Sequence, residues 1–280
     1  MGRTDAPWGT HAPNPRQARV LARAARLKPG PLAKTLRSVC FRRAGGKTPD
    51  ALFDIEPFPG QRARVHPADN ISEKRVFCAP QLWDAQERAE LAAAIAAAPA
   101  GFVFVDAGAN AGFYSLFARS AAQGAGKPIR ILAIEPAPDG RGRLQFNLAA
   151  SGADEVRVFP YAITDRDGPV NLALGDRNLG ESRIGEGEDG LIVPGRTLPS
   201  ILTEAGVDRV DALKIDIEGH ERPALEALFR EAPRALWPRL ILMEVSHDAD
   251  GAYELCLAHG YRPRLRTRMN AVLELAGLAR

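Results

Sequence analysis

From residue 100 onward, short and nearly continuous apolar runs alternate with segments whose apolar residues recur every three or four positions. The apolar runs cover 102–106, 129–135, 156–162, 210–217 and 240–246. Continuous runs of this length are typical of strands buried on both faces. Phe113, Leu116 and Phe117 show the helical spacing that fills the intervals. The alternation predicts a doubly wound α/β fold, a parallel sheet with helices on both faces.

The last part of the chain departs from this alternation. A short helix over 253–258 is expected to end at Gly260, and two strand patterns follow at 261–266 and 271–275. The interval between these two strands is too short for a crossover helix, so they must form a hairpin. We therefore expect a mostly parallel sheet of seven strands that ends in an antiparallel strand. That ending separates methyltransferase sheets from nicotinamide-binding sheets.

The N-terminal part of the chain carries a basic extension. Residues 1–48 contain eleven Lys and Arg and one acid, Asp5, whereas the remaining residues contain 26 basic and 33 acidic side chains. Disorder is expected over the Pro-rich segment 1–15, and basic helical patterns cover 16–28 and 32–43. This arm is interpreted either as a helix lying on an anionic membrane surface or a partner, or as a solvated extension.

A lead-in segment over 49–80 connects the arm to the main domain. It is Pro-rich and irregular, with one strand candidate at 75–78. A helix over 81–98 follows, rich in good helix formers and stopped by Pro99. We assign the catalytic domain to 81–280.

The bulk composition is that of an ordinary globular protein of the cytoplasm. No apolar run reaches the 18 residues of a membrane span, and no signal-peptide core is present. The three cysteines lie far apart, without the spacing of a zinc site or a disulfide framework. The acidic domain disfavours a nucleic-acid partner, because a phosphate backbone is normally bound by a basic surface.

A glycine-containing turn follows the first strand of the sheet. Asp106, Gly108, Asn110 and Gly112 lie where that strand passes into a helix. Backbone N–H groups at such a turn face the carboxyl edge of the sheet, and glycine lets the backbone approach a ligand closely. Asn110 replaces the central glycine of GxGxxG, which a pyrophosphate needs and a sulfonium amino acid does not. The alternative is a turn that serves packing alone.

Two further acidic positions fall at strand ends. Glu135 ends the second strand, where a carboxylate can accept hydrogen bonds from both hydroxyls of a ribose. Asp216 and Glu218 lie in KIDIEGHE, in a strand that also contains Lys214. Charges are costly there unless they reach the open end of the strand or a partner. They are interpreted as site residues, with a buried ion pair of Lys214 as the alternative.

His247 follows the fifth strand and completes the candidate chemistry. A neutral histidine at the carboxyl edge can take a proton from a hydroxyl nucleophile, although a lone loop histidine is commonly just exposed to solvent. Asp216 is the second candidate for this base. A metal held by Asp216 and Glu218 has no further ligand pattern in its favour, so we predict none.

Five segments together resemble the FkbM family of S-adenosylmethionine-dependent methyltransferases over roughly residues 100–250. They read VDAGANAGFYSLFA, AIEPAPDGRGRLQFNLAASG, YAITDRDG, KIDIEGHE and MEVSH. The resemblance implies a Rossmann-like class I methyltransferase fold and O-methylation of sugars or polyketide hydroxyls. Pro199 stands where the family usually has an aspartate, so the role of that acid is in doubt.

The resemblance also implies roles for individual residues. Asp106, Gly108, Asn110 and Gly112 would hold the methionine end of S-adenosylmethionine, and Glu135 would take its ribose. Tyr161 and Ala162 would lie near the adenine, and Asn147 matches an asparagine that commonly follows the Glu-Pro segment. Asp216 and Glu218 would face the methyl group and the acceptor.

Three other functions are weighed against this one. A nicotinamide dehydrogenase is disfavoured by the missing central glycine and by the closing hairpin. A nucleic-acid methyltransferase would use the basic arm, but the chain lacks an Asp/Asn-Pro-Pro-Tyr segment and a Pro-Cys nucleophile. A cofactor-binding fold used only as an interaction module is the third. The acceptor and the oligomeric state are not encoded in any recognisable pattern.

Overall fold

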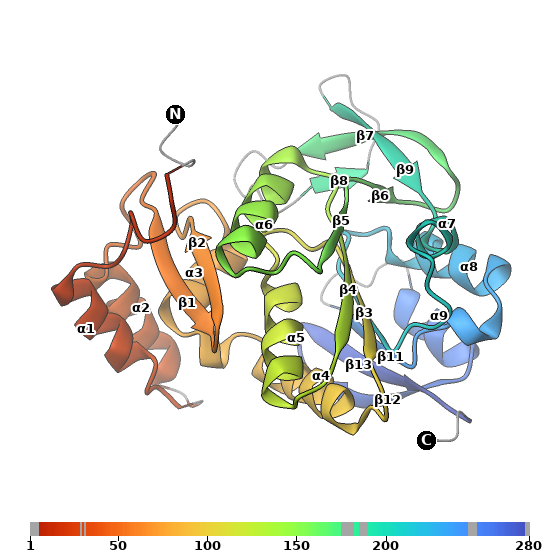
Figure 1. Ribbon diagram of the computed structural model, residues 1–280, viewed down its shortest axis with the longest axis horizontal. Helices are drawn as coiled ribbons and strands as arrows, with labels where there is room; N and C mark the ends of the chain where they lie inside the picture. The colour runs from red at the N-terminus through yellow and green to blue at the C-terminus, as the bar shows by residue number, and fades with distance from the viewer. Residues whose placement is uncertain are drawn as a thin grey trace.

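A seven-stranded sheet forms the centre of the protein (Figure 1). The computed structural model describes residues 6–28, 30, 32–174, 182–184, 190–245 and 251–277. The strand order is β12-β13-β11-β10-β3-β4-β5. The strands are β3 (Phe102–Ala107), β4 (Ile129–Ile134), β5 (Arg157–Phe159), β10 (Ala212–Ile215), β11 (Leu240–Glu244), β12 (Tyr261–Arg266) and β13 (Asn270–Leu275).

The pairing of these strands confirms the predicted class I methyltransferase sheet. β10 is parallel to β3 and β11, and β3 to β4, whereas β13 is antiparallel to both β11 and β12. The antiparallel strand therefore lies inside the sheet, between β11 and β12. The strand order reverses at β3, because the chain proceeds from β3 through β4 to β5 on one side and later returns to the other side of β3 with β10. A crevice opens at the carboxyl ends of the strands at such a reversal.

Helices cover both faces of the sheet. On one face lie α4 (Ala85–Ala97), α5 (Phe113–Gly124) and α6 (Pro138–Ala150), and on the other α7 (Leu198–Ala205), α8 (Glu221–Glu231) and α9 (Ala252–Ala258) (Figure 1). Two short 3-10 helices are η1 (Pro80–Leu82) and η2 (Arg234–Leu236). Phe104 of β3 belongs to one apolar core and Val105 to the other, because successive side chains of a strand face opposite sides.

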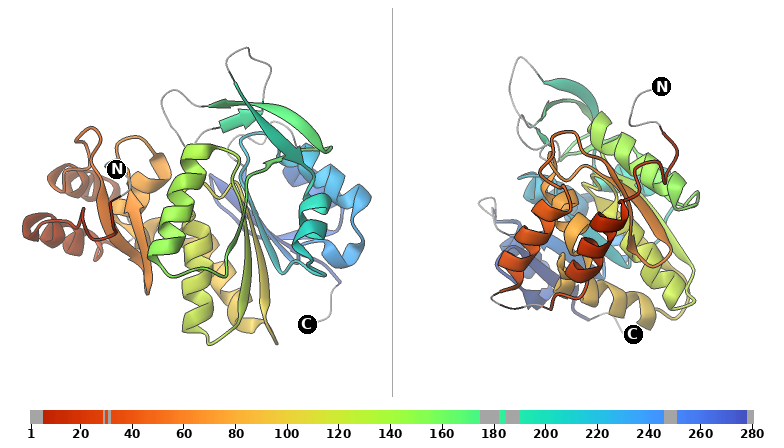
Figure 2. Two further views of the ribbon diagram at one scale, coloured as in Figure 1. Left: turned by 45° about the horizontal axis from the view of Figure 1, so that its top comes forward. Right: turned by 90° about the vertical axis from the view of Figure 1, so that its left-hand side faces the viewer.

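A second, four-stranded sheet lies at one end of the main sheet (Figure 2). Its order is β6-β9-β7-β8, with β6 (Ala162–Ile163), β7 (Gly168–Leu174), β8 (Ser182–Ile184) and β9 (Leu191–Arg196). The single strand predicted over 156–162 is wrong in this respect, since β5 ends at Phe159 and Ala162 belongs to β6. Pro160 separates the two because it lacks the N–H that a continuing strand would donate.

The N-terminal segment forms a helical pair and a hairpin beside α6 (Figure 2). It contains α1 (Pro15–Ala24), α2 (Ala33–Arg43), β1 (Phe53–Phe58), β2 (Gln61–Val65) and α3 (Ile71–Cys78). Two expectations are corrected here. The disorder expected over 1–15 is wrong for residues 6–15, which pack on the hairpin, while 1–5 lie outside the described residues. The strand candidate at 75–78 is part of α3, whose first turn is capped by Asn70.

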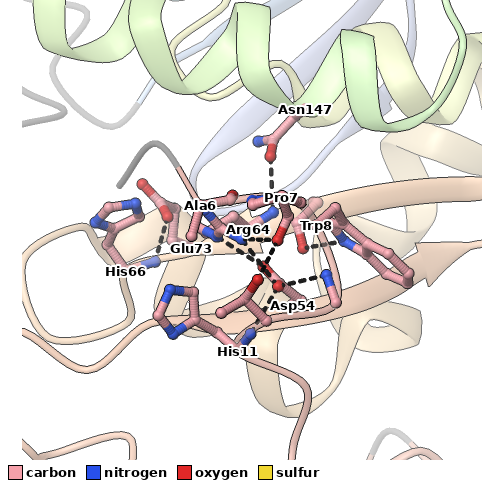
Figure 3. Close-up of polar contacts among 12 residues, drawn as sticks. Ala6, Pro7, Trp8, His11, Asp54, Arg64, His66, Glu73 and Asn147 are labelled. Carbon is pink, nitrogen blue, oxygen red and sulfur yellow. Dashed lines mark hydrogen bonds and ion pairs between the residues drawn. The ribbon is translucent and has the colours of Figure 1, made fainter. Parts of the chain in front are cut away.

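A buried ion pair fastens residues 6–11 to the hairpin (Figure 3). The Arg64 guanidinium donates to Asp54 at 2.7 and 3.0 Å and to the carbonyl oxygens of Ala6 and Pro7. The backbone N–H groups of Gly9 and His11 also donate to Asp54. Burial alone would raise the pKa of Asp54, but these hydrogen bonds lower it below its ordinary value, so the carboxylate stays ionised.

The basic helix α1 uses its apolar side for packing. Val20 and Leu21 pack against the core, whereas Arg19, Arg23 and Arg26 are exposed. No helix in the described part of the chain combines the length and the apolar character that a membrane span requires. The helix α1 thus presents its arginines outward and Val20 and Leu21 inward, whereas Leu32 and Leu36, also in the arm, are exposed.

Replacing Arg64 is expected to destabilise the protein strongly. Arg64→Met leaves the Asp54 carboxylate buried without its cation, which costs about 3–5 kcal/mol in other proteins. The measurement is the free energy of unfolding from urea titration. Arg42→Met, at an exposed arginine of α2, is the matched control and should change stability by no more than about 0.5 kcal/mol. Equal unfolding curves for the two variants would contradict this account.

Candidate functional site

A cavity of about 320 Å³ opens at the carboxyl ends of β3, β4 and β10. Most of the predicted site residues line it, together with residues from the N-terminal segment and from the second sheet. Its polar and charged lining residues are Asn70, Ser72, Arg75, Asp84, Asn110, Tyr114, Glu135, Tyr161, Lys214, Asp216, Glu218, Glu244 and Asn270. The cavity therefore occupies the position that the reversal of strand order predicts for a ligand.

The turn after β3 forms one wall of this cavity. The N–H groups of Gly108 and Ala109 both donate to the carbonyl oxygen of Ile134, at the end of β4. Gly108 has φ 76°, and a Cβ there would lie 1.9 Å from the carbonyl oxygen of Asp216. Glycine is thus required twice, for its conformation and for the close approach of the turn to the end of β10. Asn110 also has a positive φ, 49°.

Glu135 lies at the end of β4, beside the turn. One carboxylate oxygen accepts from the N–H of Asn110 at 2.7 Å and the other from the N–H of Ala137 at 2.9 Å. Gly140 lies so close that a Cβ there would be 3.2 Å from the carboxyl carbon. Burial raises the pKa of Glu135 above its ordinary value, although both hydrogen bonds act against that shift. The two amides hold the carboxylate in one orientation, with its remaining lone pairs available to a ligand.

Lys214 connects the ends of β10 and β3. Its ammonium donates to the carbonyl oxygen of Gly108 at 2.8 Å and lies 3.4 Å from Asp216 and 4.0 Å from Asp106. Burial alone would lower the pKa of Lys214, but Asp216 and Asp106 raise it above its ordinary value. The buried lysine is therefore a cation that fixes the turn and partly neutralises Asp216.

Two residues that were expected to hold the ligand lie behind the cavity wall instead. Asp106 is fully buried and accepts hydrogen bonds from the N–H and the hydroxyl of Ser115, at the start of α5. Gly112 faces away from the cavity, where a Cβ would lie 2.4 Å from Leu144 of α6. Both residues thus shape the turn without lining the cavity.

Asn147 has a comparable supporting position. Its side-chain amide donates to the carbonyl oxygen of Ala111 and accepts from the backbone N–H of Arg64 (Figure 3). One buried amide thereby joins the glycine turn, the helix α6 and the N-terminal hairpin. The structure gives a physical reason for an asparagine here, since it must donate and accept at once.

The remaining predicted residues fall into two groups. Tyr161, Ala162, Asp216 and Glu218 line the cavity with Gly108, Asn110 and Glu135. His247 lies outside the described residues, so its place relative to the cavity stays a prediction. Among the described residues there is no group of three or more His, Cys, Asp or Glu side chains that could hold a metal ion.

Sequence reasoning missed the wall that the segment before β3 supplies. Trp83 and Asp84 precede α4, and Tyr114 lies in its neighbour α5. The Tyr114 hydroxyl donates to Asp84 at 3.1 Å, and the Trp83 and Tyr114 rings meet edge to face with centroids 4.9 Å apart. Burial raises the pKa of Asp84 above its ordinary value. Asp84 fell inside the helix predicted over 81–98, which gave no reason to place it in a cavity.

The sequence matches the family model described as Methyltransferase FkbM domain over residues 106–263, more than half of the chain. Among curated proteins, it is similar to the AMB antimetabolite synthetase AmbE of Pseudomonas aeruginosa, with 27% identity over 223 residues. That match covers 63% of this chain and 10% of the relative, so the chain spans about a tenth of the relative's length.

Two solved structures to which the chain is similar are also named as methyltransferases. Precorrin-6y C5,15-methyltransferase from Geobacter metallireducens GS-15 has a TM-score of 0.43 and 16% identity, covering 67% of this chain and 87% of that chain. Methyltransferase FkbM from Methylobacillus flagellatus KT has a TM-score of 0.43 and 16% identity, covering 92% of this chain and 59% of that chain.

The close approach at Gly108 generates a stability prediction. Gly108→Ala should lower the free energy of unfolding by about 1–3 kcal/mol more than Gly206→Ala, measured by urea titration. Gly206 has a similar positive φ, 64°, but a Cβ there meets nothing within 4 Å. The free energy of unfolding of the control should therefore fall only through backbone strain, by about 1–2 kcal/mol. Equal losses for the two variants would show that the turn can retreat from Asp216 without cost.

Proposed function

Because the chain belongs to the methyltransferase FkbM domain family, we propose that it transfers a methyl group from S-adenosylmethionine to a hydroxyl group of a sugar, a glycan or a related small molecule. The observation that carries the proposal is the cavity in which the Gly108 turn and the fixed Glu135 carboxylate adjoin at neighbouring strand ends. The turn would adjoin the amino-acid part of the donor, and Glu135 offers acceptors to the ribose hydroxyls.

The shape of the turn fits a nucleoside joined to an amino acid. Gly108 lets the turn pack against the end of β10 and so form one wall of the cavity, and both oxygens of Glu135 are oriented by amides before any ligand arrives. Tyr161 and Ala162, on the same cavity wall, would flank the adenine. When bound, S-adenosylmethionine supplies a methyl group on a sulfonium, which needs no metal to react with a nucleophile. The protein must orient the acceptor about 3 Å from that methyl group and exclude water.

The charge of the cavity supports a cationic donor over a pyrophosphate coenzyme. Asp84, Glu135, Asp216, Glu218 and Glu244 line it, against Lys214 and Arg75. An excess of carboxylates attracts a sulfonium and repels phosphates. The same excess disfavours a nucleic-acid acceptor, whose backbone would have to approach this mouth.

The hydroxyl acceptor is proposed from the resemblance to the family, together with the polar lining that surrounds the donor site. A hydroxyl becomes a better nucleophile when a base takes its proton. We keep His247 and Asp216 as candidates for this base, and Glu218 as a residue that faces the acceptor. Of these candidates, Asp216 lies 3.4 Å from the Lys214 ammonium.

Binding of S-adenosylhomocysteine tests the donor site. Calorimetric titration of the whole protein should give one saturable site, and Glu135→Ala should weaken it by about 10- to 100-fold through the loss of two hydrogen bonds to a charged acceptor. Glu226→Ala, which removes an acid that pairs with Arg222 on the exposed side of α8, is the control and should bind as the wild type does. Saturation by NAD⁺ instead, with no heat from S-adenosylhomocysteine, would refute the proposal.

The acceptor is tested by transfer of a labelled methyl group. The protein and labelled S-adenosylmethionine are incubated with free sugars, oligosaccharides and an unrelated RNA, and the products are separated by mass. Label should appear on a hydroxyl of a carbohydrate, and His247→Ala or Asp216→Ala should slow that transfer. Label on RNA would support the nucleic-acid alternative, and full turnover by both variants would remove them as bases.

A further inference from the structure

Asp84 has an unusual conformation at the start of a helix. It directly precedes α4 and has φ 40° and ψ 45°, in the left-handed region that residues other than glycine seldom adopt. An aspartate at this position normally accepts a hydrogen bond from the first turn of the helix. Here the side chain makes no capping hydrogen bond and lines the cavity instead. Backbone strain of this kind is concentrated at functional sites, where the surrounding structure holds it.

The contacts of Asp84 fix its carboxylate without neutralising it. One carboxylate oxygen accepts from the hydroxyl of Tyr114, a neutral donor that is itself held by the ring of Trp83. The described part of the chain contains no ion pair to Asp84. By contrast, Asp216 lies 3.4 Å from the Lys214 ammonium. Asp84 is therefore a fixed carboxylate, in the same cavity, that lacks a paired cation of its own.

The electrostatic surroundings of Asp84 add to the negative potential. Burial is the main reason that the pKa of Asp84 is raised, and repulsion from Glu87 and Asp216 adds to it. The hydrogen bond from Tyr114 and the cation of Arg75 act in the opposite direction, and Arg88 of α4 is a second cation that interacts with Asp84. Two like charges near a carboxylate make a cationic ligand favourable there, because its arrival relieves the repulsion. A thioether of the same shape would gain nothing from this charge.

We propose that Asp84, positioned by Tyr114, recognises the positive charge of the methyl donor and so makes the cavity prefer the sulfonium over its neutral thioether product. The inference rests on the proposed use of S-adenosylmethionine. It assigns to Asp84 a role in specificity: the carboxylate favours the charged donor and loses its attraction once the methyl group has left. Release of the product is thereby favoured over release of the donor.

The test compares three ligands that share the adenosine and the amino-acid end. S-adenosylmethionine carries a sulfonium, sinefungin carries a carbon in place of the sulfur with an ammonium in the position of the methyl group, and S-adenosylhomocysteine carries no charge at this position. Asp84→Asn removes the charge, keeps the shape and suits the left-handed backbone, which asparagine adopts readily. Calorimetry at pH 8 should show the affinities for S-adenosylmethionine and sinefungin falling tenfold or more, with the affinity for S-adenosylhomocysteine unchanged within about threefold.

A matched control removes a charge from the same helix. Glu90 lies on α4, pairs with Arg264 at 2.9 Å and does not line the cavity. Glu90→Gln should therefore leave the ratio of the sulfonium and thioether affinities as it is in the wild type. Unfolding curves of all variants, with and without S-adenosylhomocysteine, establish that the donor site remains formed.

The pH dependence of the same ratio provides a second readout. As the pH falls through the raised pKa of Asp84, the carboxylate is protonated and the preference for the sulfonium should decline toward that of Asp84→Asn. The groups that face it, namely Glu87, Asp216, Arg75, Arg88 and Tyr114, are present in both proteins. Burial also raises the pKa of Glu135, whose charge can change the ratio, so the contribution of Asp84 is the difference between the pH profiles of the wild type and Asp84→Asn.

The outcomes separate the inference from the function on which it rests. A selective loss of the two cationic ligands in Asp84→Asn supports the role of Asp84. An equal loss of affinity for all three ligands would show that Asp84 has a structural role. Unchanged affinities for all three would show that the charge of Asp84 does not act on the donor. Either result overturns the inference. Failure of the wild type to bind any of the three would overturn the proposed function itself, and the inference with it.

Discussion

The cavity depends on the contact between the Gly108 turn and the end of β10. The two backbones approach so closely that no Cβ fits between Gly108 and the carbonyl oxygen of Asp216. Lys214 then fastens them, since it extends from β10 to donate to the carbonyl oxygen of Gly108. A buried ammonium is stable here because Asp106 and Asp216 flank it. These two acids therefore help to hold the turn and the end of β10 together.

The N-terminal segment is part of this construction. Asn147 holds the turn at Ala111 and the backbone of Arg64 at the same time, and Arg64 in turn fixes residues 6–11 through Asp54. Asn70 of the same segment donates to the side chain of Asn110. The N-terminal segment thus supports the wall of the cavity through a chain of buried hydrogen bonds, although it differs from the rest of the chain in charge and was expected to be less regular.

The surface of helix α1 and the cavity carry charges of opposite sign. The helix α1 exposes arginines, and the charged residues that line the cavity are mainly acids. Lysine and arginine heads remain in water at little cost, whereas the carboxylates of the cavity need fixed hydrogen-bond donors. Glu135 receives two backbone amides and Asp84 a phenol. For the proposed function, the acidic residues of the cavity favour a cationic donor over a phosphate-bearing coenzyme.

The sequence by itself determined the sheet and the site residues at the ends of its strands. Buried strands are continuous apolar runs and the turn after β3 needs glycine, so the positions of Gly108, Glu135 and Asp216 follow from local pattern. Tertiary structure alone decided that β13 lies inside the sheet, that Pro160 divides one apolar run between two sheets, and that Asp106 lies behind the cavity wall. It also brought Asp84 and Tyr114 together across two helices. Such contacts join residues far apart in the chain, and their geometry depends on packing between elements, which no local spacing of residue types records.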